Sequence, residues 1–348
     1  MMKSIFKNQL WATLLAVTTL TACNNGDPAD TPDANKVLDH LIIEEVCYSG
    51  SWHETWNSVY KEDRYIKITN PTDKVIYLDG MALAQSGLSP RKIVNLRAGT
   101  DYRNSHFGAS MLIRFPGNAN GQEYPINAGQ SVYIAKVAYN HTIPTEEGLW
   151  CKNSYDLSKV NFEWATVTQI NNDEDYPENP DVPNMLTVYP IDEGDTGLPL
   201  QIIPEYGVLA LVKIPADVTN DMLLKNDTYK WSTIWSSEDK IDGGGVVDDG
   251  GGHSHDNEFD PVVFLKLPNE WIVDAVQICP QLEFQWSVVS DKIDKGCSSV
   301  YTSSSDKNRN PKEFAGKTLK RKHDGKKFVD TDNSSIDFEI ATASLSKQ

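Results

Sequence analysis

The chain is 348 residues long and acidic, with 49 Asp and Glu against 32 Lys and Arg, a formal net charge of −17 at pH 7. Such a surface repels nucleic acid and anionic headgroups, which excludes binding driven by phosphate charge. After residue 22 no apolar run is long enough to cross a bilayer, so the sequence predicts no membrane-spanning helix in the mature chain.

The N-terminus has the pattern of a bacterial lipoprotein signal. Lys3 and Lys7 precede an apolar stretch from Leu10 to Leu20, and Leu-Thr-Ala-Cys then ends at Cys23. A box of this kind is cut before the cysteine, which is then acylated. The sequence therefore predicts a signal peptide over residues 1–22 and a lipid on Cys23 that anchors the chain without spanning the membrane. An ordinary secretory signal with a chance cysteine is the alternative.

The next segment reads as a tether. Residues 23–36 contain Pro, Asp, Asn and Gly with almost no large apolar side chains, so they cannot bury a core. Asn24 and Asn25 stand where an Asp would favour retention in the inner membrane. The predicted location is therefore the outer membrane, with the chain lipid-anchored and either periplasmic or surface-exposed.

The rest of the chain predicts strands. They are short, rich in β-branched and aromatic residues, and bounded by turn formers such as Asn70-Pro71 and Asp79-Gly80. The predicted strands cover residues 41–48, 64–70, 75–85, 131–138, 208–214, 261–267 and 271–278. One short helix is predicted over 219–226, capped by Thr219 or Asn220.

This pattern predicts an all-β fold of the sandwich type. We expect a single domain over residues 37–348, because no Pro- or Ser-rich hinge divides the chain. Long insertions are expected at about 140–205 and 238–258, and the first of them is expected to carry extra short strands.

Four cysteines remain after Cys23. An even number in an exported chain suggests disulfides, and four cysteines allow three pairings. The pairings favoured are Cys279 with Cys297 and Cys47 with Cys151, and four buried free thiols are the alternative. There is no CxxC motif and no Cys/His cluster with zinc-site spacing.

Several blocks resemble a known family. "LIIEEVCYSGS" followed by "DRYIKITNPTDKVIYLDGMALAQ" resembles the opening of lamin-tail domains. More specifically, the chain resembles a Bacteroidota lipoprotein family of unknown function built on that domain. The further blocks that carry the resemblance are residues 113–141, 155–164, 179–185, 271–278 and 316–340. The resemblance implies an immunoglobulin-like, lamin-tail-like β-sandwich and implies no reaction. Residues 173–185 and 243–258 depart from the family pattern.

Aromatic side chains near loops are the candidate contacts for a ligand or partner. They are Trp52, Trp56, Trp150 and Trp164. Tryptophan anchors protein interfaces and stacks on sugar faces. The alternative is that these side chains fold the insertions back onto the sandwich.

Two segments are candidates for binding a cation. His253 and His255 lie two apart in a Gly/Asp loop, where a solvated insertion is the alternative. "FVDTDNSSIDF", residues 328–338, places Asp330 and Asp332 like the first ligands of a calcium loop, but Ser335 and Ala341 stand where such a loop needs Gly and Glu. We therefore interpret it as a structural turn whose carboxylates the cations of residues 320–322 neutralise, with calcium as the alternative.

The sequence carries no catalytic motif such as G-x-S-x-G or HExxH. The function predicted is therefore a non-catalytic lipoprotein without a cofactor, which binds a partner outer-membrane protein such as a TonB-dependent transporter. The alternative is a glycan- or cation-binding module of the cell envelope.

Overall fold

The computed structural model describes residues 37–96, 98–144, 150–164, 179–189, 202–233, 262–302 and 310–345. The signal peptide, the tether, Cys23 and the loop with His253 and His255 lie outside these residues.

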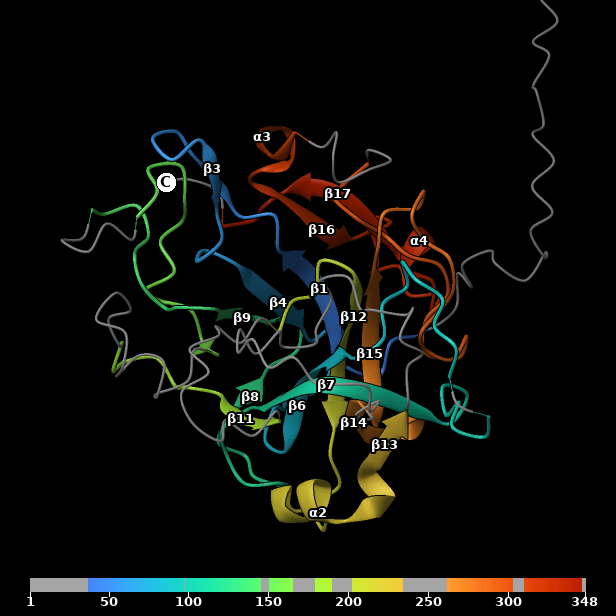
Figure 1. Cartoon of the computed structure of the whole chain (residues 1–348). Helices are drawn as coiled ribbons and strands as arrows, with labels where there is room; N and C mark the ends of the chain where they lie inside the picture. Colours follow the sequence, from blue (N-terminus) through green and yellow to red (C-terminus); the bar gives the residue numbers. More distant parts are fainter. Residues whose placement is uncertain are drawn as a thin grey trace, which may run out of the picture.

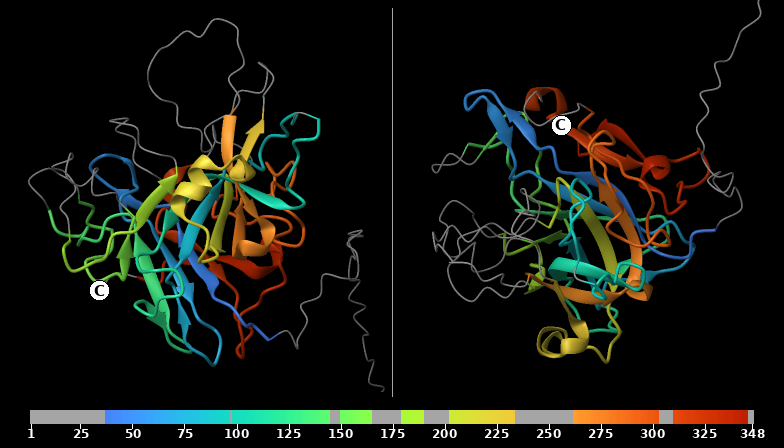
Figure 2. Two further views of the ribbon diagram at one scale, coloured as in Figure 1. Left: turned by 90° about the horizontal axis from the view of Figure 1, so that it is seen from below. Right: turned by 45° about the vertical axis from the view of Figure 1, so that its right-hand side comes forward.

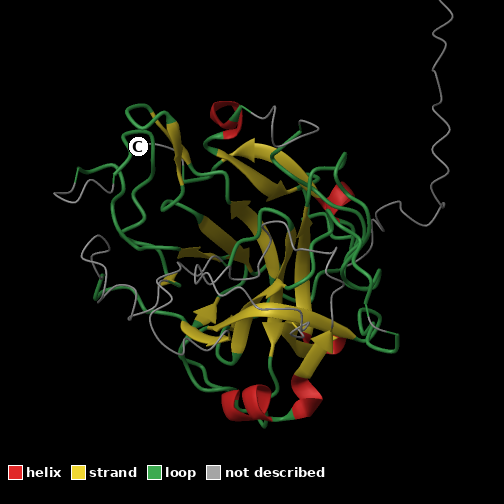
Figure 3. Cartoon of the chain, in the orientation of Figure 1, coloured by secondary structure: helices red, strands yellow, loops and turns green. Residues whose placement is uncertain are grey.

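Strands dominate the described part, and the helices are short and peripheral (Figure 3). Its strands are β1 Ile42–Cys47, β2 Ser51–His53, β3 Ser58–Tyr60, β4 Tyr65–Thr69, β5 Ile76–Tyr77, β6 Met81–Ser86, β7 His106–Arg114, β8 Pro125–Ile126, β9 Ser131–Ala135, β10 Phe162–Glu163, β11 Leu186–Tyr189, β12 Gly207–Lys213, β13 Lys230–Thr233, β14 Val262–Pro268, β15 Ile272–Ile278, β16 Lys317–Arg321 and β17 Phe338–Thr342. The helices are α2 Asn220–Lys225, α3 Pro311–Phe314 and α4 Ser334–Asp337, with 3₁₀ turns at Asp227–Tyr229 and Asn269–Trp271.

The predicted strands are confirmed, with one division. The segment predicted over 75–85 forms two strands, β5 and β6, because Gly80 between them adopts a φ of 77° that ends the first strand in a turn. The predicted helix is α2, and the Thr219 side chain accepts a hydrogen bond from the N–H of Met222 as its cap. The longest strand among the described residues, β7, was not predicted, since Gly108 and Ala109 in its sequence HFGASMLIR are weak strand formers.

The described strands form an all-β sandwich. One sheet has the order β10-β9-β4-β1-β16-β17, and the other has the order β13-β14-β7-β6-β12-β15 with β11 paired to β7 (Figure 1). Neighbours in both sheets are antiparallel, apart from β10, which runs parallel to β9. The main core lies between the sheets and includes Ile43 and Ile66 from the first sheet and Leu83 and Leu209 from the second.

The second sheet is buried on both faces. Leu209 and Leu211 of β12 point into the main core, whereas Val208, Ala210 and Val212 point into a second core on the other face. Leu223 of α2 contributes to this second core. Burial on both faces explains why β12 reads as a continuous apolar run rather than an alternating one.

The first insertion contributes strands to both sheets. Within residues 140–205, β10 extends the first sheet and β11 pairs with β7 of the second, which confirms the expected extra strands. The second insertion, at about 238–258, lies outside the described residues.

The short helices mark two ends of the molecule. In Figures 1 and 2, α2 lies at one end, and α3 lies at the opposite end beside β3. Among the described residues, no helix has the length and apolar character that a membrane span requires.

Candidate functional site

A separate hairpin of β2 and β3 forms the framework of the candidate site. Its strands pair with Ser51 opposite Tyr60 and His53 opposite Ser58, apart from the two main sheets. The chain reverses through residues 54–57, where Asn57 adopts a φ of 50° that Asn tolerates better than most side chains. The hairpin thereby presents Trp56, which is 49% exposed, at its tip.

Aromatic rings gather around this hairpin. The His53 ring stacks on Trp56 with ring centroids 3.9 Å apart, and Trp150 meets the edge of His53 at 6.2 Å. The backbone N–H of Trp56 donates to His53 Nδ1 at 3.0 Å, which fixes the turn against the ring. We call His53, Trp56, Trp150 and the neighbouring Trp52 the aromatic corner.

Trp52 connects the aromatic corner to α3. Its indole Nε1–H donates to Glu54 at 3.2 Å, and the Lys312 ammonium lies 5.3 Å from the ring centroid. Lys312 also forms an ion pair with Glu54 at 3.1 Å. These contacts hold the hairpin and α3 in a common orientation through one cation.

The base of the hairpin is anchored by a buried histidine. The Tyr60 hydroxyl lies 2.7 Å from His141 Nδ1, while His141 Nε2 lies 3.1 Å from the carbonyl oxygen of Val137. Burial lowers the pKa of His141 to about 4, so the ring is neutral at pH 7. A neutral ring that donates from Nε2 to Val137 accepts from Tyr60 at Nδ1, and the hairpin is therefore held rigidly on the domain.

A cleft of about 700 Å³ opens beside the hairpin. This volume is within the range of small-molecule sites. The cleft is lined by Trp52, Asn57, Ser58, Val59, Lys61, Glu205, Tyr206, Tyr301, Asn310, Pro311 and Lys312. It joins β3, the segment before β12, the segment around residue 301 and α3, which are far apart in the sequence.

The cleft combines aromatic walls with fixed charges. Glu205 accepts hydrogen bonds from Lys61 at 3.0 Å and from Arg64 at 2.6 Å. Burial disfavours the charge on Glu205, but the two cations outweigh it and hold its pKa below the usual range. The Arg91 guanidinium lies 4.0 Å from the ring centroid of Tyr206. The described lining can therefore stack on an apolar face and bond to polar groups of one ligand.

The structure places two of the four predicted tryptophans, Trp56 and Trp150, against the His53 ring, and it places Trp52, the residue before His53, in the lining of the cleft. Trp52, Trp56 and Trp150 lie in the aromatic corner, but Trp164 is only 1% exposed and packs in the main core. The prediction of Trp164 as a ligand or partner contact is therefore wrong. Its backbone N–H donates to the carbonyl oxygen of Ala135 in β9, and its side chain packs among the apolar residues of the main core. Sequence reasoning missed the cleft residues around 205 and 301 because no local motif marks them.

The cysteines do not form the predicted disulfides in this structure. All four described cysteines are buried, and none of them is in a disulfide. Cys47 packs with Tyr65 and Tyr155, whereas the Cys151 thiol donates to the carbonyl oxygen of Trp52 at the hairpin edge. The pairing of these two is therefore not supported. Cys279 and Cys297, in contrast, share one small cluster.

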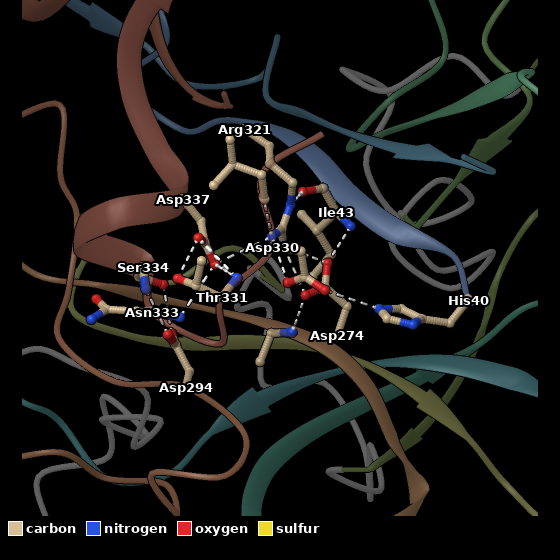
Figure 4. A network of polar contacts seen from close by, with 12 residues as sticks. His40, Ile43, Asp274, Asp294, Arg321, Asp330, Thr331, Asn333, Ser334 and Asp337 are labelled. Carbon is tan, nitrogen blue, oxygen red and sulfur yellow. Dashed lines mark hydrogen bonds and ion pairs between the residues drawn. The ribbon is translucent and has the colours of Figure 1, made fainter. Parts of the chain in front are cut away.

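The Asp-rich segment near the C-terminus forms a charged clasp centred on Arg321 (Figure 4). The Arg321 guanidinium bonds both oxygens of Asp274 at 2.7 Å and Asp330 at 3.0 Å, and it lies 3.5 Å from Asp337. Its Nε also donates to the carbonyl oxygen of Ile43 at 3.1 Å. These contacts join β1, β15, β16 and the C-terminal turn. The predicted neutralisation by a cation of residues 320–322 is confirmed, and Arg321 provides it.

The turn itself is closed by short polar side chains, as predicted. Asp337 accepts hydrogen bonds from the N–H and hydroxyl of Thr331, at 3.0 and 2.7 Å. Ser334 donates through its N–H to Asp294 at 2.7 Å, and Asp332 takes a φ of 53°. Asp330, one of the candidate metal ligands, is thus committed to Arg321. Within the described ranges, no three His, Cys, Asp or Glu side chains are grouped to hold a metal ion.

His40 completes the clasp, and the stability of the protein is expected to depend on its charge. Its Nε2 lies 3.5 Å from Asp330, and the hydrogen bond to Asp330 is the main cause that raises the pKa of His40 from 6.5 to about 9, against the opposing effect of burial. A pKa that is higher in the folded state adds stability that is complete below the unfolded value of 6.5 and is lost as the pH rises through 9.

We therefore expect His40→Gln to lower the free energy of unfolding by about 2 kcal/mol near pH 6 and by much less near pH 10. Urea unfolding of both proteins at the two pH values measures this. A loss of equal size at both pH values would contradict a charged His40.

Comparison with known proteins agrees with this fold. Residues 127–345 match the family described as "Protein of unknown function (DUF4876)". The chain is similar to a solved structure, the crystal structure at 2.50 Å resolution of a DUF4876 family protein from Bacteroides thetaiotaomicron VPI-5482. The TM-score is 0.62 at 20% sequence identity, over 87% of this chain and 71% of that chain, a likeness that shows the fold alone. No curated protein matches. Because the family match covers well over half of the chain, the protein belongs to the DUF4876 family.

Proposed function

We propose that the protein is a non-catalytic lipoprotein of the outer membrane, anchored through Cys23, which binds a partner membrane protein through its aromatic corner. The partner class is an outer-membrane protein such as a TonB-dependent transporter. The observation that carries the proposal is the exposed Trp56 at the tip of a hairpin, stacked on His53 and held by its backbone. Tryptophans that are fixed before binding are typical hot spots of interfaces, because they bury a large area at little entropic cost.

The remaining features are consistent with this proposal. The lipobox at Cys23 and the tether of residues 24–36 would place the domain at the membrane surface within reach of a membrane partner. The blocks that resemble lamin-tail domains support an immunoglobulin-like version of the sandwich, a fold that recurs in binding modules. The one carboxylate of the described cleft lining, Glu205, is already paired with Lys61 and Arg64, which suits recognition better than proton transfer.

The test is co-purification of the full lipidated chain from envelope membranes after mild cross-linking. We expect the wild type to recover one predominant outer-membrane protein. Trp56→Ala should weaken this association by about 30-fold, the effect of losing a hot-spot side chain worth about 2 kcal/mol.

Met222→Ala is the matched control, since Met222 is 39% exposed on α2 at the opposite end of the molecule from α3 (Figure 2). It should retain full recovery. Recovery of no outer-membrane protein by the wild type, or equal recovery by wild type and Trp56→Ala, would refute the proposal.

A glycan is the second candidate ligand, favoured by the cleft itself. Trp52, Tyr206 and Tyr301 provide aromatic surface around the polar groups of Glu205 and Asn310. Sugars are held in this way, with ring faces stacked on aromatics and hydroxyls bonded to polar side chains. Calorimetric titration with a panel of soluble envelope oligosaccharides, compared between wild type and Trp52→Ala, distinguishes the two candidates. Saturable binding that Trp52→Ala abolishes would favour the glycan.

A further inference from the structure

Cys279 and Cys297 lie side by side where β15 ends. Both are buried, at 0% and 3% exposure. The N–H of Cys279 donates to the carbonyl oxygen of Ser298 at 3.0 Å, and the N–H of Ser298 donates to Gln277 at 3.0 Å. Two ladder-like bonds therefore fix the segment that begins at Cys297 against the end of β15, so the two cysteines lie on neighbouring stretches of backbone.

The two thiols share one environment. They pack in a small cluster with Tyr206 and Phe284. A hydrogen bond with the Cys297 thiol is the main cause that raises the pKa of Cys279, and burial is the second. Gln281 Oε1 also lies 3.7 Å from the Cys297 sulfur. The two thiols therefore belong to one buried cluster and come from neighbouring stretches of backbone, the arrangement from which a disulfide can form.

We infer that Cys279 and Cys297 are joined by a disulfide in the exported protein, and that Cys47 and Cys151 stay as thiols. The inference depends on the proposed envelope location in one respect, which is that this compartment supplies the oxidising conditions. In the reaction, the two thiols lose two protons and two electrons as the S–S bond forms. The electrons reduce the disulfide of an envelope thiol oxidoreductase to a dithiol, through a mixed disulfide with one of the two cysteines.

The burial of the pair sets when the bond forms. Exchange needs a thiolate and access to an oxidant, and the folded state withholds both. The bond is therefore made before this part of the chain closes, and once made it is shielded from reductants. Under native conditions a small thiol reagent should leave it intact, whereas in denaturant it should be reduced.

The cross-link would stabilise one wall of the cleft. Tyr206 packs on the cysteine pair and lines the cleft, and Tyr301, four positions after Cys297, lines it too. Between Cys297 and Tyr301 in the sequence, the N–H of Val300 donates to the Tyr48 hydroxyl at 2.8 Å. Fastening Cys297 to β15 limits the motion of this segment and so keeps both tyrosine rings in place.

Peptide mapping of the protein isolated from the envelope tests the inference. The protein is denatured and alkylated without reduction, then digested with trypsin, which places Cys279 in residues 267–292 and Cys297 in residues 296–307. We expect these two peptides as one cross-linked species and alkylation of Cys47 and Cys151. Alkylated Cys279 and Cys297, or either one linked to Cys47 or Cys151, would overturn the inference.

Refolding of the purified full chain in a glutathione buffer separates this inference from the proposed location. If the proposed envelope location is wrong but the pairing is right, Cys279 and Cys297 are reduced in the protein isolated from cells and still form the disulfide in the refolding buffer. If the pairing itself is wrong, the disulfide is absent both from the isolated protein and from the refolded protein. The double variant Cys279→Ala/Cys297→Ala should melt several degrees lower than the oxidised wild type, on the order of 5 °C.

Hydrogen exchange provides a readout specific to the cleft wall. The amides of residues 298–301 should exchange at least several-fold faster in the double variant, whereas the hairpin of β2 and β3 should be unchanged. Equal exchange of residues 298–301 in both proteins would show that the cross-link does not restrain this wall.

Discussion

Replacing Arg321 by methionine is expected to lower the free energy of unfolding by about 3–5 kcal/mol, with a Tm lower by roughly 10 °C. Arg321 is 2% exposed and faces the carboxylates of Asp274, Asp330 and Asp337. Without the guanidinium, the three buried carboxylates lose the cation that they share, and His40 stays 3.5 Å from Asp330. The loss arises mainly from this uncompensated charge rather than from the lost contacts, since methionine fills much of the same volume.

Two further variants test that explanation. Lys320→Met makes the same substitution at the adjacent position of β16, outside the clasp, and should change Tm by no more than a degree or two. Adding Asp274→Asn and Asp330→Asn to Arg321→Met should recover part of the lost stability at neutral pH. If the triple variant is less stable than Arg321→Met alone, the buried charge is not the cause of the loss.

The clasp is also expected to work without calcium. Because the Asp330 carboxylate already accepts a hydrogen bond from the Arg321 guanidinium, adding calcium or EDTA should leave the Tm of the wild type unchanged. A rise on adding calcium that EDTA reverses would restore the cation reading of residues 328–338.

Trp164→Ala is expected to lower the free energy of unfolding by about 3–5 kcal/mol, because it empties a large, fully buried volume between the sheets. Trp56→Ala should cost less than about 1 kcal/mol, since nearly half of that side chain is exposed and it packs mainly on His53. Chemical unfolding monitored by circular dichroism measures both.

The two variants thus separate a structural tryptophan from a functional one. In the co-purification assay, Trp164→Ala should retain the partner at temperatures where it is folded, whereas Trp56→Ala should lose it. Equal stability losses in the two variants would contradict the assignment of Trp164 to the core and of Trp56 to the surface.

The sequence alone determined most of the local structure. Runs of β-branched residues between turn formers predicted β1, β4, β9, β12, β14 and β15, because strand propensity and turn chemistry act over a few residues. Thr219, a residue type that caps helix N-termini, likewise predicted the start of α2. Strand β7 escaped prediction because its Gly108 and Ala109 are poor strand formers that the sheet accepts for close packing. Gly108 leaves room for Trp231, whose ring a Cβ would meet at 2.7 Å.

Only the tertiary structure decided which residues meet. In the sequence, four tryptophans lie near predicted loops. In the folded chain, Trp164 is buried in the main core, whereas Trp52, Trp56 and Trp150 lie at the hairpin of β2 and β3. In "FVDTDNSSIDF" the local spacing of oxygen atoms was compatible with calcium or with a turn. The pairing of β1 with β16, and the contact of β15 with β1, bring Arg321 and Asp274 to the segment from distant parts of the chain. Local propensity encodes elements, but long-range pairing selects their partners, and the electrostatics of a buried site depends on the partners.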